Sequence, residues 1–440
     1  MSDASSWQSP ILDLRRLVLF RGLLARPLLV RLLSRAEAGA DPADLYGEWL
    51  YLLSREQRLW TCPILRQAAD PWEAWLIDAV LGDENLWTLS AEKGQDPGPV
   101  LAESAARDLD LLARARGALA AVRQAAGLGP APAGSWALPA DEPSIPRRSE
   151  REAVVRALVR GRDWSALAGD LARYLRSAGA GPFNGAYTFL WDEQGLAPVL
   201  NPDPVRLEHL TGYQSEREQV IANTRRLVQG LPAHHLLLYG DRGTGKSATV
   251  KALAHRFADD GLRLVEVPKS ALEELDRVVE RLGQRGLAFV IFIDDLSFEA
   301  GETDYKELKA LLEGTVRAQA PNVRVYATSN RRHLIKEEFS DRRGGAWGTA
   351  ADDVRSQDTL QEKLSLADRF AVTIIFPTPS QKEYLEIVDS LAAQYGLEID
   401  RQRLAQMALQ WAAWQNGRSA RTARQFIESL VGEALPGEDT

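Results

Sequence analysis

The sequence predicts a chain in three parts, whose central part is a layered α/β domain built on a parallel sheet. Three observations indicate this organisation. Apolar residues recur at helical spacing across residues 1–126. Between residues 205 and 378, continuous apolar runs alternate with helical patterns, as expected for parallel strands that are buried on both faces. Helical patterns also follow Pro379, which predicts a small all-α domain over residues 379–440.

The N-terminal half reads as mostly helical. Residues 1–126 form the predicted helical domain, and residues 127–148 are rich in Gly, Pro and Ala, which predicts a linker or a long surface loop. Residues 149–204 are expected to connect the two domains. They are helical to about Ala178 and then form a short hairpin or an extended pair around residues 193–195.

The α/β domain, residues 205–378, contains the strands of the predicted sheet. Its apolar runs are bounded by turn residues, and helical patterns lie between them, so helices should cover both faces. The predicted sheet is five-stranded and parallel, with strands at residues 235–239, 262–267, 287–294, 322–329 and 370–376.

Composition limits the environment and the partners of the chain. The formal net charge of the 440 residues is −8, which excludes a basic nucleic-acid footprint over the whole protein but leaves room for a local basic patch. The single cysteine, Cys62, excludes an intrachain disulfide framework and is typical of a reducing cytosol. The first ten residues lack the basic and apolar regions of a signal peptide. We therefore expect a cytoplasmic protein.

A leucine-rich stretch near the N-terminus is interrupted by arginines, which exclude a membrane-spanning helix because each is costly at the bilayer centre. We expect helices packed on their own domain; a basic helix on a membrane surface is the alternative. Tryptophan is concentrated before the α/β domain, where we expect core packing rather than a recognition surface. The interrupting arginines are Arg15, Arg16, Arg21, Arg26, Arg31 and Arg35.

The stretch "GDRGTGKS" meets the phosphate-loop pattern G-x-x-x-x-G-K-[ST], with a buried strand before it and a helix after it. Glycines let backbone N–H groups approach phosphate oxygens, and the helix N-terminus adds partial positive charge. Lys246 would reach the β- and γ-phosphates, and the Ser247 hydroxyl would ligate Mg²⁺. The predicted nucleotide-binding segment is Gly240, Asp241, Arg242, Gly243, Thr244, Gly245, Lys246, Ser247 and Ala248.

A second motif, "AFVIFIDDLSFE", ends a buried strand in two carboxylates. The carboxyl end of a central parallel strand lies beside the phosphate loop in such sheets. Asp294 would hold Mg²⁺ through water, and Asp295 would orient or deprotonate the attacking water. Together the two motifs predict a site for Mg-ATP.

At this point the chain resembles the AAA+ ATPases. Within them it is very similar to a bacterial family of ATP-binding proteins known only as a domain of unknown function. The resemblance covers about residues 205–432. It rests on "GDRGTGKSATVKAL", "IDDLSFE", "YKELKALLEG", "NVRVYATSNRRHL", "EKLSLADRF" and "GRSARTARQFI". It implies a five-stranded P-loop sheet between helices and an α-helical lid.

The resemblance also implies further residues for phosphoryl transfer. A polar residue at the end of the strand between the phosphate motifs positions the attacking water; here it is Asn330, with Ser329 as the alternative. An arginine that reaches the ATP of the neighbouring subunit corresponds to Arg369 in "LADRF". The arginine of the lid that touches the γ-phosphate corresponds to Arg421, with Arg424 one helical turn away as the alternative.

Two more positions follow from the resemblance. The segment "LEHLTGY", with Leu210 and Tyr213, resembles the part that covers adenine. Many AAA+ proteins have Glu where this chain has Asp295, whose side chain is one methylene shorter. The motif therefore assures ATP binding more than fast turnover. Glu299 is a nearby carboxylate, but it lies beyond the strand end.

A charged segment, residues 331–365, separates Asn330 from the last predicted strand. Its basic residues could meet a phosphate backbone, but acids are interleaved with them, so a solvated loop is an equal interpretation. Trp347, among glycines, is the residue there that suggests a contact point.

The leading hypothesis is an ATP-driven AAA+ machine or switch that assembles as a ring or spiral, with nucleotide at the subunit interfaces. Its client is unidentified. A helicase-loader-like ATPase that contacts single-stranded DNA is one alternative, and a slowly hydrolysing ATP-gated scaffold is another. A small-molecule P-loop kinase is less favoured because the helical lid with its "GRSAR" run argues against it.

Overall fold

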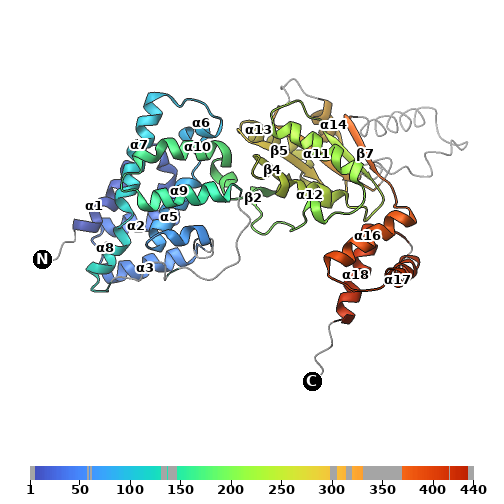
Figure 1. The fold of residues 1–440 in the computed structure, drawn as a ribbon. Helices are drawn as coiled ribbons and strands as arrows, with labels where there is room; N and C mark the ends of the chain where they lie inside the picture. The colour runs from blue at the N-terminus through green and yellow to red at the C-terminus, as the bar shows by residue number, and fades with distance from the viewer. Residues whose placement is uncertain are drawn as a thin grey trace, which may run out of the picture.

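The fold is described from a computed structural model, which describes residues 5–56, 59, 62–129, 136, 146–297, 305–313, 320–330, 369–415 and 417–434. A helical N-terminal unit, an α/β unit and a helical lid follow one another (Figure 1). Each unit has its own buried apolar side chains, two clusters of them in the α/β unit.

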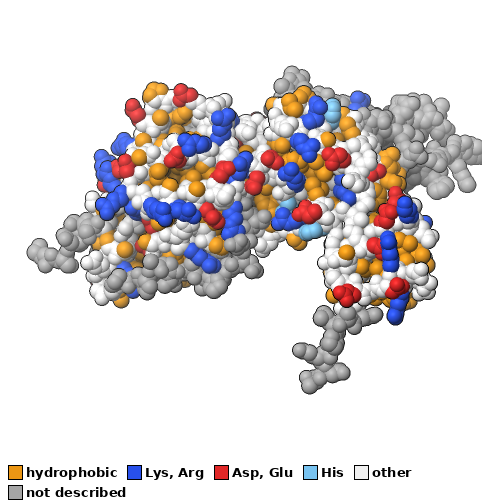
Figure 2. Space-filling view, in the orientation of Figure 1, with side chains coloured by type: hydrophobic (Ala, Val, Ile, Leu, Met, Phe, Trp, Pro, Cys, Tyr) orange, Lys and Arg blue, Asp and Glu red, His pale blue; other side chains and the backbone are white. Residues whose placement is uncertain are grey.

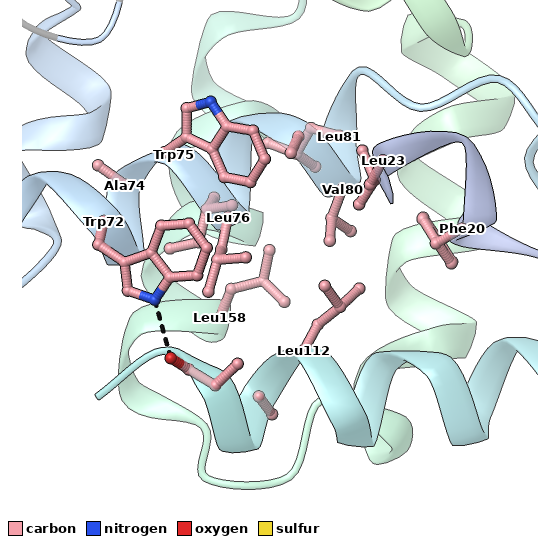
Figure 3. Close-up of a cluster of buried hydrophobic side chains, with 14 of the residues drawn as sticks. Phe20, Leu23, Trp72, Ala74, Trp75, Leu76, Val80, Leu81, Leu112 and Leu158 are labelled. Carbon is pink, nitrogen blue, oxygen red and sulfur yellow. Dashed lines mark hydrogen bonds between the residues drawn. The ribbon is translucent and has the colours of Figure 1, made fainter. Parts of the chain in front are cut away.

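The N-terminal unit packs its helices around one buried cluster rich in tryptophan. Trp72 stacks on Trp75 with ring centroids 5.3 Å apart and meets Trp49 edge-on at 4.8 Å. The indole Nε1 of Trp72 donates to the Ala115 carbonyl over 2.8 Å (Figure 3). These rings fill the core, as the sequence predicted. The helices are α1 (Ser5–Asp13), α2 (Pro27–Glu37), α3 (Pro42–Ser54), α5 (Pro71–Leu81), α6 (Leu86–Glu92), α7 (Gly98–Ala115), α8 (Ala118–Ala125), α9 (Arg148–Arg160) and α10 (Ala168–Ala178).

Side-chain caps define several of these helix starts. Asp41 precedes Pro42 and accepts from the backbone at the start of α3, and Asp70 precedes Pro71 and does the same for α5. Asp–Pro fits a helix start because the carboxylate accepts an otherwise unpaired N–H and proline has no N–H to satisfy.

The arginine-rich stretch packs on its own unit. Leucines of α2 are buried, while Arg31 and Arg35 pair with Glu48 of α3 at 2.5 and 3.0 Å, and Arg15 pairs with Glu37 at 2.6 Å. Basic and acidic side chains are interspersed over this unit on the face in Figure 2. Among the residues that the structure describes, no helix is both long enough and apolar enough to cross a bilayer.

The sheet has seven strands, two more than predicted. The five predicted strands form a parallel core, and the expected hairpin adds β1 and β2 at one edge, giving the order β2-β1-β4-β5-β6-β3-β7. β1 pairs parallel with β4, and the hairpin pair β1–β2 is antiparallel. The strands are β1 (Thr188–Asp192), β2 (Gly195–Pro198), β3 (Leu236–Gly240), β4 (Leu262–Glu266), β5 (Ala288–Ile293), β6 (Val323–Ser329) and β7 (Val372–Phe376).

Helices cover both faces of the sheet. On one face Val220 of α11 (Gln214–Val228) and Val250 of α12 (Lys246–Phe257) join strand side chains in one cluster. On the other face Val278 of α13 (Leu275–Gly283) and Leu308 of α14 (Tyr305–Glu313) join another. The lid packs α16 (Gln381–Gln394), α17 (Arg401–Trp414) and α18 (Ala420–Ala434) around a cluster of its own. The layered α/β prediction is confirmed.

The N-terminal and α/β units meet through a buried ion pair. Arg285, just after α13, contacts Glu92 of α6 through two hydrogen bonds of 2.9 and 2.5 Å. Residues 149–204, expected as a connecting segment, divide between the units. Helices α9 and α10 bury their apolar face in the N-terminal cluster, and β1 and β2 extend the sheet.

Candidate active site

The loop between β3 and α12 requires its glycines for two different reasons. Gly240, Gly243 and Gly245 have φ values of 150°, 78° and 91°, which L-residues with side chains rarely adopt. A Cβ on Gly240 would lie 1.9 Å from the Phe376 carbonyl oxygen of β7. A Cβ on Gly243 would lie 2.8 Å from the Ser419 hydroxyl, at the start of the last lid helix. The loop is therefore packed tightly between the edge strand and the lid.

Lys246, the first residue of α12, is only 5% exposed. Its ammonium group donates to the carbonyls of Gly240 (2.7 Å) and Asp241 (2.8 Å) and to Asn330 Oδ1 (2.9 Å). Burial lowers the pKa of Lys246 to about 8, and nearby aspartates oppose that shift. The side chain is therefore charged at neutral pH, and its ammonium group is held against the carbonyls of the loop.

The acidic motif meets the loop through Asp294. Its Oδ1 accepts from the Ser247 hydroxyl over 2.5 Å and from the Thr328 hydroxyl over 2.5 Å. The parallel register that pairs Ile293 with Ala327 brings Asp294 and Thr328 together at adjacent strand ends. Hydroxyl and carboxylate oxygens are the protein ligands that Mg²⁺ prefers, together with phosphate oxygens of a nucleotide. The residues present therefore fit Mg-ATP, for which Ser247 would ligate the metal and Asp294 would hold it through water.

Asp295 has an unusual backbone conformation, and Asn330 holds its side chain. Its φ is 50°, in the left-handed region, and such outliers cluster at functional sites. Asn330 Nδ2 donates to Asp295 Oδ1 over 2.6 Å, while Asn330 Oδ1 accepts from Lys246. One amide therefore bridges the predicted base, Asp295, and Lys246, the lysine predicted to bind phosphate.

These residues line one cavity of about 540 Å³. One wall is the segment before α11, including Leu210, and another is the lid, including Ile387 and Arg424. The cavity thus joins the phosphate loop to the lid and to the segment before α11, two regions that the resemblance assigned to nucleotide. Predicted site residues on its wall are Arg242, Gly243, Thr244, Gly245, Lys246, Ser247, Ala248, Asp294, Asp295, Asn330 and Arg421.

Other predicted site residues lie beside the cavity rather than on its wall. The carboxylate of Asp241 accepts from the Thr378 hydroxyl, at the connection to the lid. Tyr213 donates to the Pro377 carbonyl over 2.7 Å, and its ring lies 5.3 Å from that of Phe376. Both side chains therefore hold the connection between sheet and lid. Like them, Gly240 is not on the cavity wall.

Arg369 is exposed, next to buried Phe370 and just before β7, and it does not line the cavity of its own chain. Both candidates for the lid arginine, Arg421 and Arg424, do line it. The backbone N–H of Arg421 donates to the Gly243 carbonyl over 3.2 Å, which ties the lid directly to the phosphate loop.

Sequence reasoning missed Thr328 and Arg217, which both line the cavity. No local pattern marks Thr328, because it lies beside Asp294 only through the parallel register that pairs Ile293 with Ala327. Nothing in the sequence around Arg217 marks it. The predictions for Glu299, Trp347 and residues 331–365 fall outside the described residues.

A phosphate loop, an acidic strand end and a helical lid on a parallel sheet are the arrangement that the resemblance to AAA+ ATPases led us to expect. Residues 184–434, more than half of the chain, match the family described as "Protein of unknown function (DUF815)", and the chain belongs to that family.

Among solved structures, the chain is similar to the RuvB Holliday junction branch migration motor of Thermotoga maritima, with 16% identity and a TM-score of 0.35. Two single-residue variants of that motor match with 16% identity and TM-scores of 0.36. Each alignment covers 52% of this chain and 65% of the motor, less than two thirds of its length. A search of curated proteins found no match.

Proposed function

We propose that this chain binds Mg-ATP in the cavity described above and hydrolyses it as an AAA+ ATPase. The observation that carries the proposal is the network that joins Lys246, Asn330 and Asp295 on one wall of that cavity. Phosphoryl transfer needs a cation that binds the phosphates and polar groups that position the attacking water. The ammonium group supplies the first, and the amide and the carboxylate supply the second.

Each residue has a distinct role in this proposal. Lys246 and the backbone N–H groups of the loop hold the triphosphate, and Ser247 and Asp294 hold the magnesium ion, which neutralises phosphate charge. Asp295 orients the attacking water and accepts its proton, while Asn330 keeps that carboxylate in place. Since Asp295 is one methylene shorter than Glu, we expect slow turnover.

The proposed enzyme works as a homo-oligomer, in a ring or spiral. Arg369 is exposed and lies off the cavity wall of its own chain, which supports a role at the nucleotide of a neighbouring copy. An arginine supplied by a neighbour stabilises the charge that develops on the transferred phosphoryl group and can raise the rate by orders of magnitude. Hydrolysis of ATP would then drive movement between subunits, and this movement would remodel a client.

Single-turnover hydrolysis of ATP tests the assignments. Lys246→Ala should lose ATP binding and hydrolysis together. Asp295→Asn should keep ATP binding and lose about a hundredfold or more in rate, because only the base is removed. Equal rates for wild type and Asp295→Asn would remove the base assignment and favour an ATP-gated scaffold. Wild-type protein without affinity for Mg-ATP would overturn the whole proposal.

Mixing two inactive variants tests the shared site. An Arg369→Ala subunit keeps an intact loop, and a Lys246→Ala subunit keeps the arginine. If Arg369 acts on its neighbour, the mixture should recover part of the wild-type rate, and mass measurement with ATP should show mixed oligomers. A mixture as inactive as its components, despite mixed oligomers, contradicts the role in trans.

A further inference from the structure

Thr328 contacts both acidic residues of the site. Its hydroxyl donates to Asp294 Oδ1 over 2.5 Å and accepts from the backbone N–H of Asp295 over 2.9 Å. Its carbonyl accepts from the backbone N–H of Leu296 over 2.7 Å. One residue of β6 therefore holds three consecutive residues at the end of β5. It is 1% exposed, so bulk water does not compete for these contacts.

The direction of the Thr328 hydroxyl is determined by its partners. A hydroxyl has one hydrogen and two lone pairs. The carboxylate can only accept, so the single hydrogen points to Asp294, and a lone pair receives the N–H of Asp295. Valine has the same shape but can neither donate to Asp294 nor accept from Asp295, whereas serine keeps the hydroxyl that does both.

The contacts of Asp294 concentrate on one oxygen. Oδ1 accepts from Ser247, from Thr328 and, over 3.1 Å, from the backbone N–H of Asp295. Ser247 is expected to ligate magnesium. The Thr328 hydroxyl is then the one side-chain donor of this set that has no metal role, and it fixes how the carboxylate is turned.

We propose that Thr328 is a positioning residue that orients Asp294 for magnesium and holds Asp295 in its left-handed conformation. The inference rests on the proposed ATPase function. Groups that hydrogen-bond to metal ligands commonly change metal affinity by about 10- to 100-fold when removed. The Leu296 contact uses backbone only, so a side-chain substitution isolates the hydroxyl.

The test compares the affinity for ATP with Mg²⁺ and with EDTA, for wild type, Thr328→Val and Thr328→Ser. Thr224→Val is the matched control, because Thr224 is also fully buried in this unit but bonds Val220 and Tyr326, away from the acids. We expect Thr328→Val to lose about tenfold of the enhancement by Mg²⁺ and to keep its affinity in EDTA. Thr328→Ser and Thr224→Val should behave as wild type.

An unchanged enhancement by Mg²⁺ in folded Thr328→Val overturns the inference and leaves the ATPase proposal intact. Wild-type protein that binds no ATP under either condition overturns both. If Thr328→Val does not fold, Thr328→Cys replaces it, since a thiol is a weak donor and should lose a smaller part of the enhancement, about threefold. Wild-type enhancement in the cysteine variant would then refute the role.

Discussion

At the residue scale, the amide of Asn330 connects Lys246 to Asp295. It accepts from Lys246 and donates to Asp295, so it holds a cation and an anion of the site in place. We expect Asn330→Ala to keep most of the ATP affinity and to lower the single-turnover rate of hydrolysis by about a hundredfold, because the base is no longer positioned.

Ser329→Ala is the matched control for that measurement. Ser329 is fully buried in β6, and its side chain does not line the cavity, so its variant should hydrolyse ATP at nearly the wild-type rate. A large loss in Ser329→Ala with a normal rate in Asn330→Ala would exchange the two assignments. Asn330 was predicted from the family resemblance; Thr328 was not predicted, because its place beside Asp294 depends on the register between β5 and β6.

At the element scale, the packing of β3 against β7 explains Gly240 better than phosphate binding does. The sequence motif predicts Gly240 as part of the nucleotide-binding loop, yet an added Cβ would overlap the backbone of Phe376. We expect Gly240→Ala to destabilise the fold by about 3 kcal/mol or more, because two paired strands must separate. Thermal unfolding of the purified variants measures this.

Gly245→Ala is the comparison for Gly240→Ala. No atom lies within 4 Å of its added Cβ, so only the positive φ of 91° is strained. The expected cost is about 1–2 kcal/mol. Equal destabilisation by the two variants would show that backbone strain, not the contact with β7, accounts for both effects.

The elements themselves were largely predictable, and their neighbours were not. Strands β3 to β7 are near-continuous apolar runs, so each was visible in the sequence. The hairpin was also visible, but β1 is exposed at Leu190 and buried at Phe189, as in a strand with one covered face. Its place beside β4 depends on pairing Phe189 with Val265, far along the chain, which no local pattern reveals.

At the scale of the whole molecule, a buried ion pair between Arg285 and Glu92 helps to join the N-terminal helices to the α/β unit, and Arg285 also pairs with the exposed Glu84 over 2.8 Å. The side chains of Arg285 and Glu92 are 5% and 0% exposed. Glu92 also accepts from the backbone N–H groups of Gly286 (2.8 Å) and Ala180 (2.7 Å). Gly286 directly follows Arg285, and Ala180 lies just after α10. The partners lie 193 residues apart, so composition and periodicity could not predict that the units are joined here.

Removing one member of this pair should loosen the N-terminal unit from the sheet. Because Arg285→Met leaves the Glu92 carboxylate buried without its charge partner, we expect a cost of about 3–5 kcal/mol and separate thermal unfolding of the two units. Adding Glu92→Gln should recover part of that loss, since the uncompensated charge is gone, with a coupling of about 2 kcal/mol in a double-mutant cycle. Arg173→Met removes an exposed pair with Asp170 and should cost about 0.5 kcal/mol or less. If Arg285→Met unfolds in one transition at the temperature of Arg173→Met, the pair does not hold the units together.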